Sequence, residues 1–257
     1  MADAPAILLH DLRKTYGDFE AVRGLNVSVR PGEIYSFLGA NGAGKTTTMK
    51  MMVGILPPTD GRVEILGHDV WKQPAQAKRL IGYVPDTPIL HELLTAQEFL
   101  WFMADLYSLP RAEGKERTQE LLRFLGLTQA ADKLIRDFSL GMKRKMAIAT
   151  ALLNRPPVLL LDEVTNGLDA RAAREVKDLV VSLAKQSGTA VFLTTHILSI
   201  PEEMADRIGL IHKGQIVAEG TMAELQALAG RPEAHLEELF LHFTGEQLER
   251  EEAGVIG

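Results

Sequence analysis

The amino-acid sequence predicts an α/β fold: a parallel sheet, an N-terminal antiparallel β subdomain and an inserted helical subdomain. The apolar run Val158–Leu161 is typical of a strand covered on both faces in a parallel sheet. Strand-like and helix-like segments alternate along most of the chain, which favours a doubly wound arrangement. From Thr95 to about Arg155, apolar residues recur only at helical spacing. That stretch therefore predicts the helical insertion.

The first third of the chain predicts short strands and one helix. Strands are expected at 7–9 and 27–29, with a turn at 30–33 leading into a buried central strand at 33–38. Next come a helix at 46–55 and two strands at 62–66 and 80–84, bounded by glycine and proline.

The remaining elements follow the same reasoning. Within the insertion, about 88–155, Thr95 and Glu98 form a capping-box pattern, and a long helix is expected at 145–153. A helix at 170–185, a strand at 189–194, a hairpin over 208–218, and helices at 221–229 and 235–247 complete the chain. We therefore expect one domain over 1–232 and an acidic helical extension over 233–257.

Composition narrows the classes of protein. The 257 residues are 46% hydrophobic and 24% charged, as in ordinary globular proteins. No apolar run reaches the roughly 18–20 residues that span a bilayer. Cysteine is absent, which rules out disulfides and thiolate chemistry and fits the cytoplasm. The net charge of −6 argues against a nucleic-acid partner.

The loop after the central strand carries the pattern G-x-x-x-x-G-K-[ST]. It consists of Gly39, Ala40, Asn41, Gly42, Ala43, Gly44, Lys45, Thr46 and Thr47. Its glycines let backbone N–H groups point inward at oxyanions, and the helix start adds positive potential. Lys45 is expected to reach the β- and γ-phosphates of a nucleotide, and the Thr46 hydroxyl to ligate Mg²⁺. The loop predicts a phosphate-loop NTPase core.

Two other strand ends carry polar side chains. Asp162 and Glu163 end the apolar run, and His196 follows the next strand. Because ligands bind at the carboxyl ends of parallel strands, we expect these side chains to lie near the phosphate loop. Asp162 suits an outer partner of Mg²⁺, and Glu163 suits a residue that polarises the water attacking the γ-phosphorus.

The segment 138–144 is ambiguous from its residues alone. Ser139 suits a helix N-cap with free backbone N–H groups near it, but an ordinary helix start explains the pattern as well. The basic run Lys143–Lys145 is most often a solvated face.

With these features the whole chain resembles an ABC-transporter ATP-binding subunit. Tyr16 matches the aromatic residue on which adenine stacks, 39–47 matches the Walker A loop, and 138–142 resembles the LSGGQ signature. Residues 158–163 match Walker B with its catalytic glutamate, 166–169 resemble the D-loop, and His196 resembles the switch histidine. The similarity is greatest to bacterial exporter subunits of the type-2 and Ecs-like groups.

The resemblance implies ATP and Mg²⁺ as ligands and ATP hydrolysis as the activity. It assigns catalysis to Glu163 and His196, and Mg²⁺ binding to Thr46, Asp162 and Asp86. The implied ATP-binding residues are Tyr16, Gly39, Asn41, Gly42, Ala43, Gly44, Lys45, Thr46, Thr47, Ser139 and Gly141.

Three positions depart from the family pattern. Asp86 replaces the glutamine of the Q-loop, and a carboxylate near a triphosphate is repelled unless Mg²⁺ or water lies between them. We therefore expect Asp86 to sense Mg²⁺ through water. Leu140 replaces a signature glycine, and Val164 replaces a proline, with little effect expected at Val164.

The resemblance also implies partners. In the family, the phosphate loop and the signature face each other across a subunit boundary, which implies a homodimer or a heterodimer with a second ATP-binding subunit. An integral membrane permease is the implied partner, at the cytoplasmic face of the cell membrane. The apolar pairs 89–90 and 93–94 then line its docking groove, unless they are ordinary core.

Two other classes remain as alternatives. The first is a soluble ABC-type ATPase that acts on the ribosome or DNA, which usually has two nucleotide domains or a long coiled coil. The second is a small-molecule kinase, which lacks the signature and the D-loop. The sequence reveals neither the transported substrate nor the transport direction beyond subfamily similarity.

Overall fold

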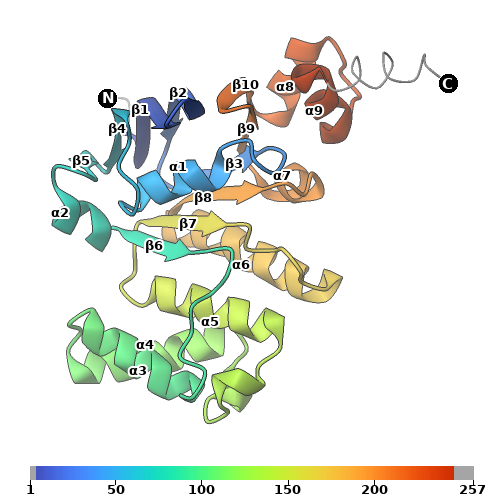
Figure 1. The fold of residues 1–257 in the computed structure, drawn as a ribbon. Coiled ribbons are helices and arrows are strands. Elements are labelled where there is room, and N and C mark those ends of the chain that lie inside the picture. The colour runs from blue at the N-terminus through green and yellow to red at the C-terminus, as the bar shows by residue number, and fades with distance from the viewer. Residues whose placement is uncertain (1–3, 246–257) are drawn as a thin grey trace.

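The computed structural model describes residues 4–245, and a six-stranded sheet runs through its centre in the order β10-β9-β3-β8-β7-β6 (Figure 1). Five strands are parallel and β10 is antiparallel to β9. The bounds are β3 Ile34–Leu38, β6 Ile81–Val84, β7 Val158–Asp162, β8 Ala190–Thr195, β9 Arg207–His212 and β10 Gln215–Gly220. Every residue of β3, β7 and β8 is buried, which confirms the predicted parallel sheet covered on both faces.

A second, antiparallel sheet has the order β2-β1-β4-β5. Its strands are β1 Ile7–Tyr16, β2 Phe19–Val29, β4 Asp60–Ile65 and β5 His68–Asp69. The expected strands at 7–9 and 27–29 were too short, because pairing continues to the turn at Tyr16 and Phe19. Register shifts interrupt this ladder, and such irregularities break the apolar–polar alternation from which strands are predicted.

Helices cover both faces of the central sheet and form a separate layer beside β6 (Figure 1). That layer contains α3 Ala96–Leu106, α4 Arg111–Phe124 and α5 Leu140–Leu152. The other helices are α1 Lys45–Met52, α2 Pro74–Arg79, α6 Ala170–Ser187, α7 Ser199–Met204, α8 Met222–Ala229 and α9 Leu236–Thr244. Within residues 4–245, no helix is long and apolar enough to cross a membrane.

Local caps account for where several helices begin and end. The predicted capping box is confirmed, since Thr95 and Glu98 exchange side-chain-to-backbone hydrogen bonds. The expected helix start at Lys145 was wrong: the Ser139 hydroxyl accepts a hydrogen bond from the Met142 N–H at 3.3 Å, so α5 begins at Leu140. Gly245, with φ of 73°, ends α9, and the rest of the expected helix to Gln247 lies outside the described residues.

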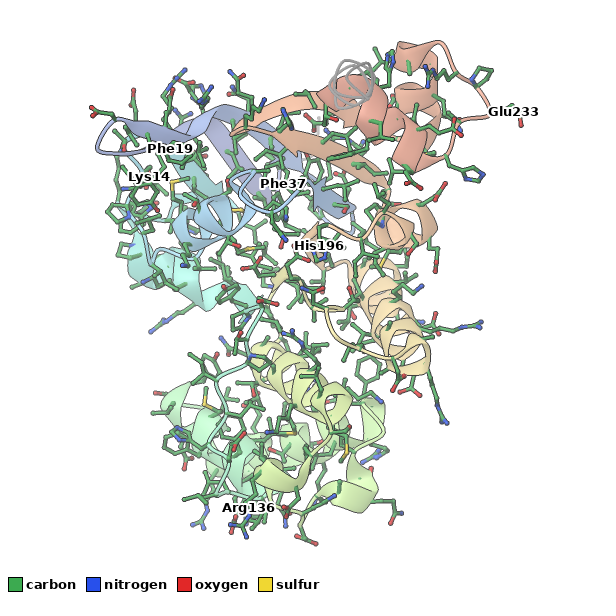
Figure 2. The ribbon with its side chains drawn as sticks, turned by 45° about the vertical axis from the view of Figure 1, so that its right-hand side comes forward. Lys14, Phe19, Phe37, Arg136, His196 and Glu233 are labelled. Atoms are coloured by element: carbon green, nitrogen blue, oxygen red, sulfur yellow. The ribbon has the colours of Figure 1, made fainter. Side chains whose placement is uncertain are left out.

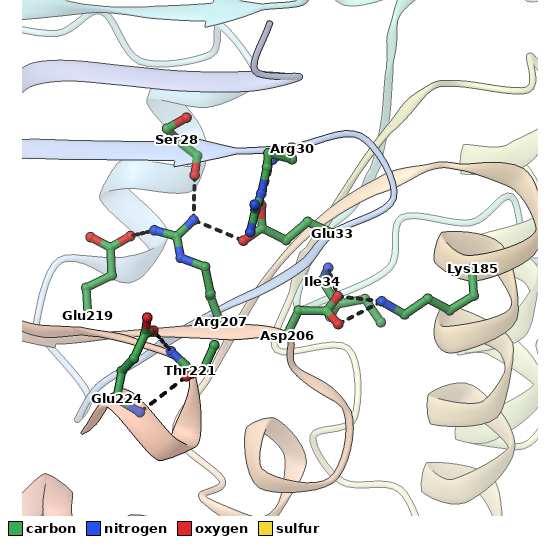
Figure 3. Close-up of polar contacts among 10 residues, drawn as sticks. All are labelled: Ser28, Arg30, Glu33, Ile34, Lys185, Asp206, Arg207, Glu219, Thr221 and Glu224. Carbon is green, nitrogen blue, oxygen red and sulfur yellow. Dashed lines mark hydrogen bonds and ion pairs between the residues drawn. The ribbon is translucent and has the colours of Figure 1, made fainter. Parts of the chain in front are cut away.

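An ion-pair network fixes the start of β3 and therefore the strand that precedes the phosphate loop (Figure 3). Arg207 on β9 donates to the Ser28 carbonyl and to Glu33, both at 2.9 Å, and also pairs with Glu219. The guanidinium lies over the buried Tyr35 ring, 5.4 Å from its centre. These contacts connect the end of β2, the start of β3 and the β9–β10 hairpin.

Candidate nucleotide-binding site

The phosphate loop occupies the short connection between β3 and α1. Gly42 and Gly44 have φ of 82° and 109°, a left-handed backbone that glycine adopts without strain. A Cβ at Gly39 would lie 2.5 Å from the Ile211 carbonyl oxygen, so a side chain there would displace the neighbouring strand. The buried Lys45 ammonium donates to the carbonyls of Gly39 and Ala40 at 2.7 and 3.2 Å.

Glu163 is the point at which three predicted residues meet. Its Oε1 lies 3.3 Å from Lys45 Nζ, and its Oε2 lies 2.9 Å from His196 Nδ1. Glu163 has a φ of 49°, an uncommon conformation for a non-glycine residue and one that recurs at functional sites. Its backbone N–H donates to the Thr194 carbonyl on β8. Figure 2 shows His196 between the sheet and the helical layer.

These residues belong to one cleft with a volume of about 530 Å³. It is lined by Tyr16, Phe19, Ala21, Asn41, Gly42, Gly44, Lys45, Thr46, Thr47, Asp86, Glu163, Asn166 and His196. The sequence did not single out Phe19, which is 61% exposed and enters the cleft through the turn that follows Tyr16. The sequence feature that could have identified Phe19 is its position as an aromatic residue in the turn next to Tyr16, the predicted adenine contact.

Ser139 lies at a different place on the molecule. It lines a second hollow, with Met142, Asp169 and Ala172, between the helical layer and α6. Gly141 packs in the same region, where a Cβ would lie 3.2 Å from the Cβ of Ala172. A single chain therefore presents the phosphate loop and the signature segment on separate surfaces.

Asp162 is buried beside the cleft rather than lining it. It ends β7, is 2% exposed, and accepts a hydrogen bond from the Thr194 hydroxyl at 2.6 Å. Burial raises the pKa of Asp162, and the neighbouring carboxylates of Glu163 and Asp86 add to the rise, against the Thr194 hydrogen bond. The carboxylate is therefore held at a cost to folding.

We expect Asp162→Asn to be at least as stable as the original chain at neutral pH, but about 10- to 100-fold less active. Because the folded-state pKa is raised, the stability that Asp162 contributes is present below its unfolded pKa and lost as pH rises through the folded pKa. Asparagine carries no charge and keeps an oxygen for Thr194. Thermal unfolding across pH 3–8, with ATPase assays, would check this; a variant that is less stable than the original chain at neutral pH contradicts it.

Asp86 enters the cleft from the segment that follows β6. Its carboxylate lies 3.4 Å from a guanidinium nitrogen of Arg144 on α5. No group of three or more His, Asp or Glu side chains in residues 4–245 is placed to hold a metal ion.

The geometry agrees with the comparisons to known proteins. The family model described as ABC transporter matches residues 22–166. The chain belongs to the ABC transporter family. It is 42% identical to the bacitracin transport ATP-binding protein BcrA of Bacillus licheniformis, over 81% of this chain and 67% of that protein. It is 40% identical to the daunorubicin/doxorubicin resistance ATP-binding protein DrrA of Streptomyces peucetius, over 88% and 68% of the two chains.

Solved structures of ABC cassettes have the same fold. An ATP-binding subunit of an ABC transporter matches with a TM-score of 0.85 and 33% identity, covering 93% of this chain and 99% of that one. A dimeric ATP-binding cassette in a post-hydrolysis state, bound to ADP and Pi, matches with a TM-score of 0.76 and 27% identity, covering 84% and 98%. This ABC transporter chain thus binds and hydrolyses ATP, which excludes the small-molecule kinase.

Proposed function

We propose that this chain hydrolyses ATP at composite sites, each formed by the cleft of one copy and the Ser139 segment of another, and thereby drives an exporter. The separation of the two surfaces within one chain carries this proposal. The dimeric cassette that resembles this chain supports it. The two relatives are named for bacitracin transport and drug resistance, which favours export over action on the ribosome or DNA.

Each site residue has a role that its surroundings support. Glu163 positions the attacking water, and Lys45 neutralises charge on the γ-phosphate as it develops. Lys45 Nζ lies 3.3 Å from Glu163 Oε1, so the phosphate-binding cation and the carboxylate that accepts a proton from water face the same point in the cleft. His196 holds the other oxygen, Oε2. The identity of the ATP-binding residues, from Tyr16 to Gly141, stays a prediction, as does the division at 232 and 233.

The residues suit Mg²⁺ bound together with ATP. Thr46 lines the cleft beside Lys45, and the buried Asp162 adds a carboxylate that is close enough to Lys45 and Glu163 to interact electrostatically with both. Mg²⁺ prefers few protein ligands and keeps several waters and phosphate oxygens, which agrees with this sparse set. Bound there, it would neutralise phosphate charge.

A membrane permease is the proposed partner, at the cytoplasmic face of the membrane, with a second ATP-binding subunit that is either identical or different. Ile89 and Leu93 are 89% and 77% exposed, whereas Leu90 and Leu94 pack against the helical layer. Ile89 and Leu93 therefore offer the most apolar surface to a partner, whereas the partly buried Leu90 and Leu94 contribute mainly to the core, the alternative that the sequence left open.

We expect Ile89→Asp combined with Leu93→Asp to abolish co-purification with the proposed membrane permease. Basal ATPase of the isolated chain should change by less than about twofold, because exposed substitutions cost little stability. Leu228→Asp is the matched control, since Leu228 is also exposed, at 65%, but lies on α8. Equal loss of co-purification in the control would contradict this docking surface.

A further inference from the structure

Arg144 is a buried cation that connects the signature helix to the nucleotide cleft. It lies on α5, is 4% exposed, and donates to the Pro85 carbonyl at 3.1 Å and to Asp86 Oδ1 at 3.4 Å. Its Nε is buried, with no hydrogen-bond partner within residues 4–245. A buried guanidinium is costly unless it is hydrogen-bonded and paired with an opposite charge. The Pro85 carbonyl and the Asp86 carboxylate supply these partners, so the three residues fix one another's positions.

Asp86, the acidic partner of Arg144, lies in the proposed nucleotide cleft. Asp86 is 51% exposed at its side chain and lines the cleft with Lys45 and Glu163. Without compensation, its charge would add to that of Glu163 and oppose a triphosphate. Arg144 supplies a compensating charge from behind the cleft.

Pro85 and Asp86 begin a connecting segment, residues 85–94, that leads from β6 toward α3. A second set of contacts joins the far end of this segment to the residues around Ser139. The Arg136 N–H donates to the Glu92 carbonyl and the Ile135 N–H to the Leu94 carbonyl, both at 3.0 Å. Lys143, next to Arg144, pairs with the Glu92 side chain at 2.5 Å. In Figure 1 this segment runs from β6 past α5 to α3. The segment is thus attached to the signature region at both ends.

We propose that Arg144 is a positioning residue with two separable effects. It neutralises Asp86, so that a carboxylate is tolerated beside the triphosphate. It also connects the cleft to α5, so that the nucleotide bound in one copy sets the placement of Ser139 toward the nucleotide of the other. The second effect rests on the proposed composite site; the first does not.

The test measures ATP binding by calorimetry and ATP-driven pairing by light scattering, with every variant made alongside Glu163→Gln to prevent turnover. Arg144→Gln should weaken ATP binding by on the order of tenfold, the effect expected of an uncompensated charge near the phosphates. Arg144→Lys should retain most of the binding. Asp86→Asn with Arg144→Gln should restore binding, yet pair at least about tenfold more weakly at equal ATP saturation.

Arg117→Gln is the matched control. Arg117 is also a largely buried arginine, donating to the Leu152 carbonyl at the end of α5, but it does not line the cleft. It should change neither ATP binding nor ATP-driven pairing.

The neutralising effect is refuted if a folded Arg144→Gln binds ATP normally or if the double variant fails to restore binding. If Arg144→Gln does not fold, Asp86→Asn is measured in its place. This variant should bind ATP normally but pair more weakly. Normal pairing would refute the proposal that Arg144 and Asp86 connect the cleft to α5. Absence of pairing with Arg144 intact would instead refute the composite site.

Discussion

Glu163→Gln is expected to lower the rate of ATP hydrolysis by about 100- to 10,000-fold, the usual contribution of a positioned general base. The amide keeps the size of the side chain but cannot accept the proton of the attacking water. It also removes the negative charge that faces Lys45 at 3.3 Å, so ATP binding should be retained or strengthened. Phosphate release and nucleotide binding, measured on the same preparation, separate the two effects.

Glu64→Gln provides the control for this experiment. Glu64 is a partly buried glutamate on β4 that pairs with Arg62 at 2.7 Å, in the antiparallel sheet and away from both the nucleotide cleft and the Ser139 surface. It should hydrolyse ATP at close to the original rate. Wild-type turnover in Glu163→Gln would remove Glu163 from the catalytic role and leave the function of its contacts with Lys45 and His196 unexplained.

Mixing two inactive variants should restore activity if the sites are composite. Lys45→Ala removes the cation of the phosphate loop, and Gly141→Asp places a negative charge where the signature would meet the phosphates, so each alone should fall at least about 100-fold. In a homodimer, random mixing makes half of the pairs mixed, with one of two sites intact. The mixture should therefore regain up to about a quarter of the original rate.

The recovered rate is read against each variant assayed alone at the same total concentration. As a control, Lys45→Ala mixed with a second phosphate-loop variant, Thr46→Ala, should regain nothing, because no site is then complete. A mixture of Lys45→Ala and Gly141→Asp that stays inactive, although mixed pairs form, would mean that a pair of identical chains does not build the site.

Much of the cleft was predictable because its parts obey short-range rules. The phosphate loop is defined by glycine spacing between a strand and a helix. Glu163 and His196 follow apolar strands, and parallel strands bring their carboxyl ends to one edge of a sheet. Their meeting at 2.9 Å follows from that topology. The length of β1 and β2 was not predictable in the same way, because an irregular ladder leaves no regular alternation.

The sequence by itself determined the family, the phosphate loop and which strand ends carry reactive side chains, because these depend on residues close together along the chain. The tertiary structure alone decided that Asp86 faces Arg144, 58 residues away. It also decided that Ile89 is exposed while Leu90 is partly buried against the apolar core. Both outcomes depend on how the helical layer packs against β6, and burial of a particular side chain is a property of that packing rather than of its neighbours in sequence.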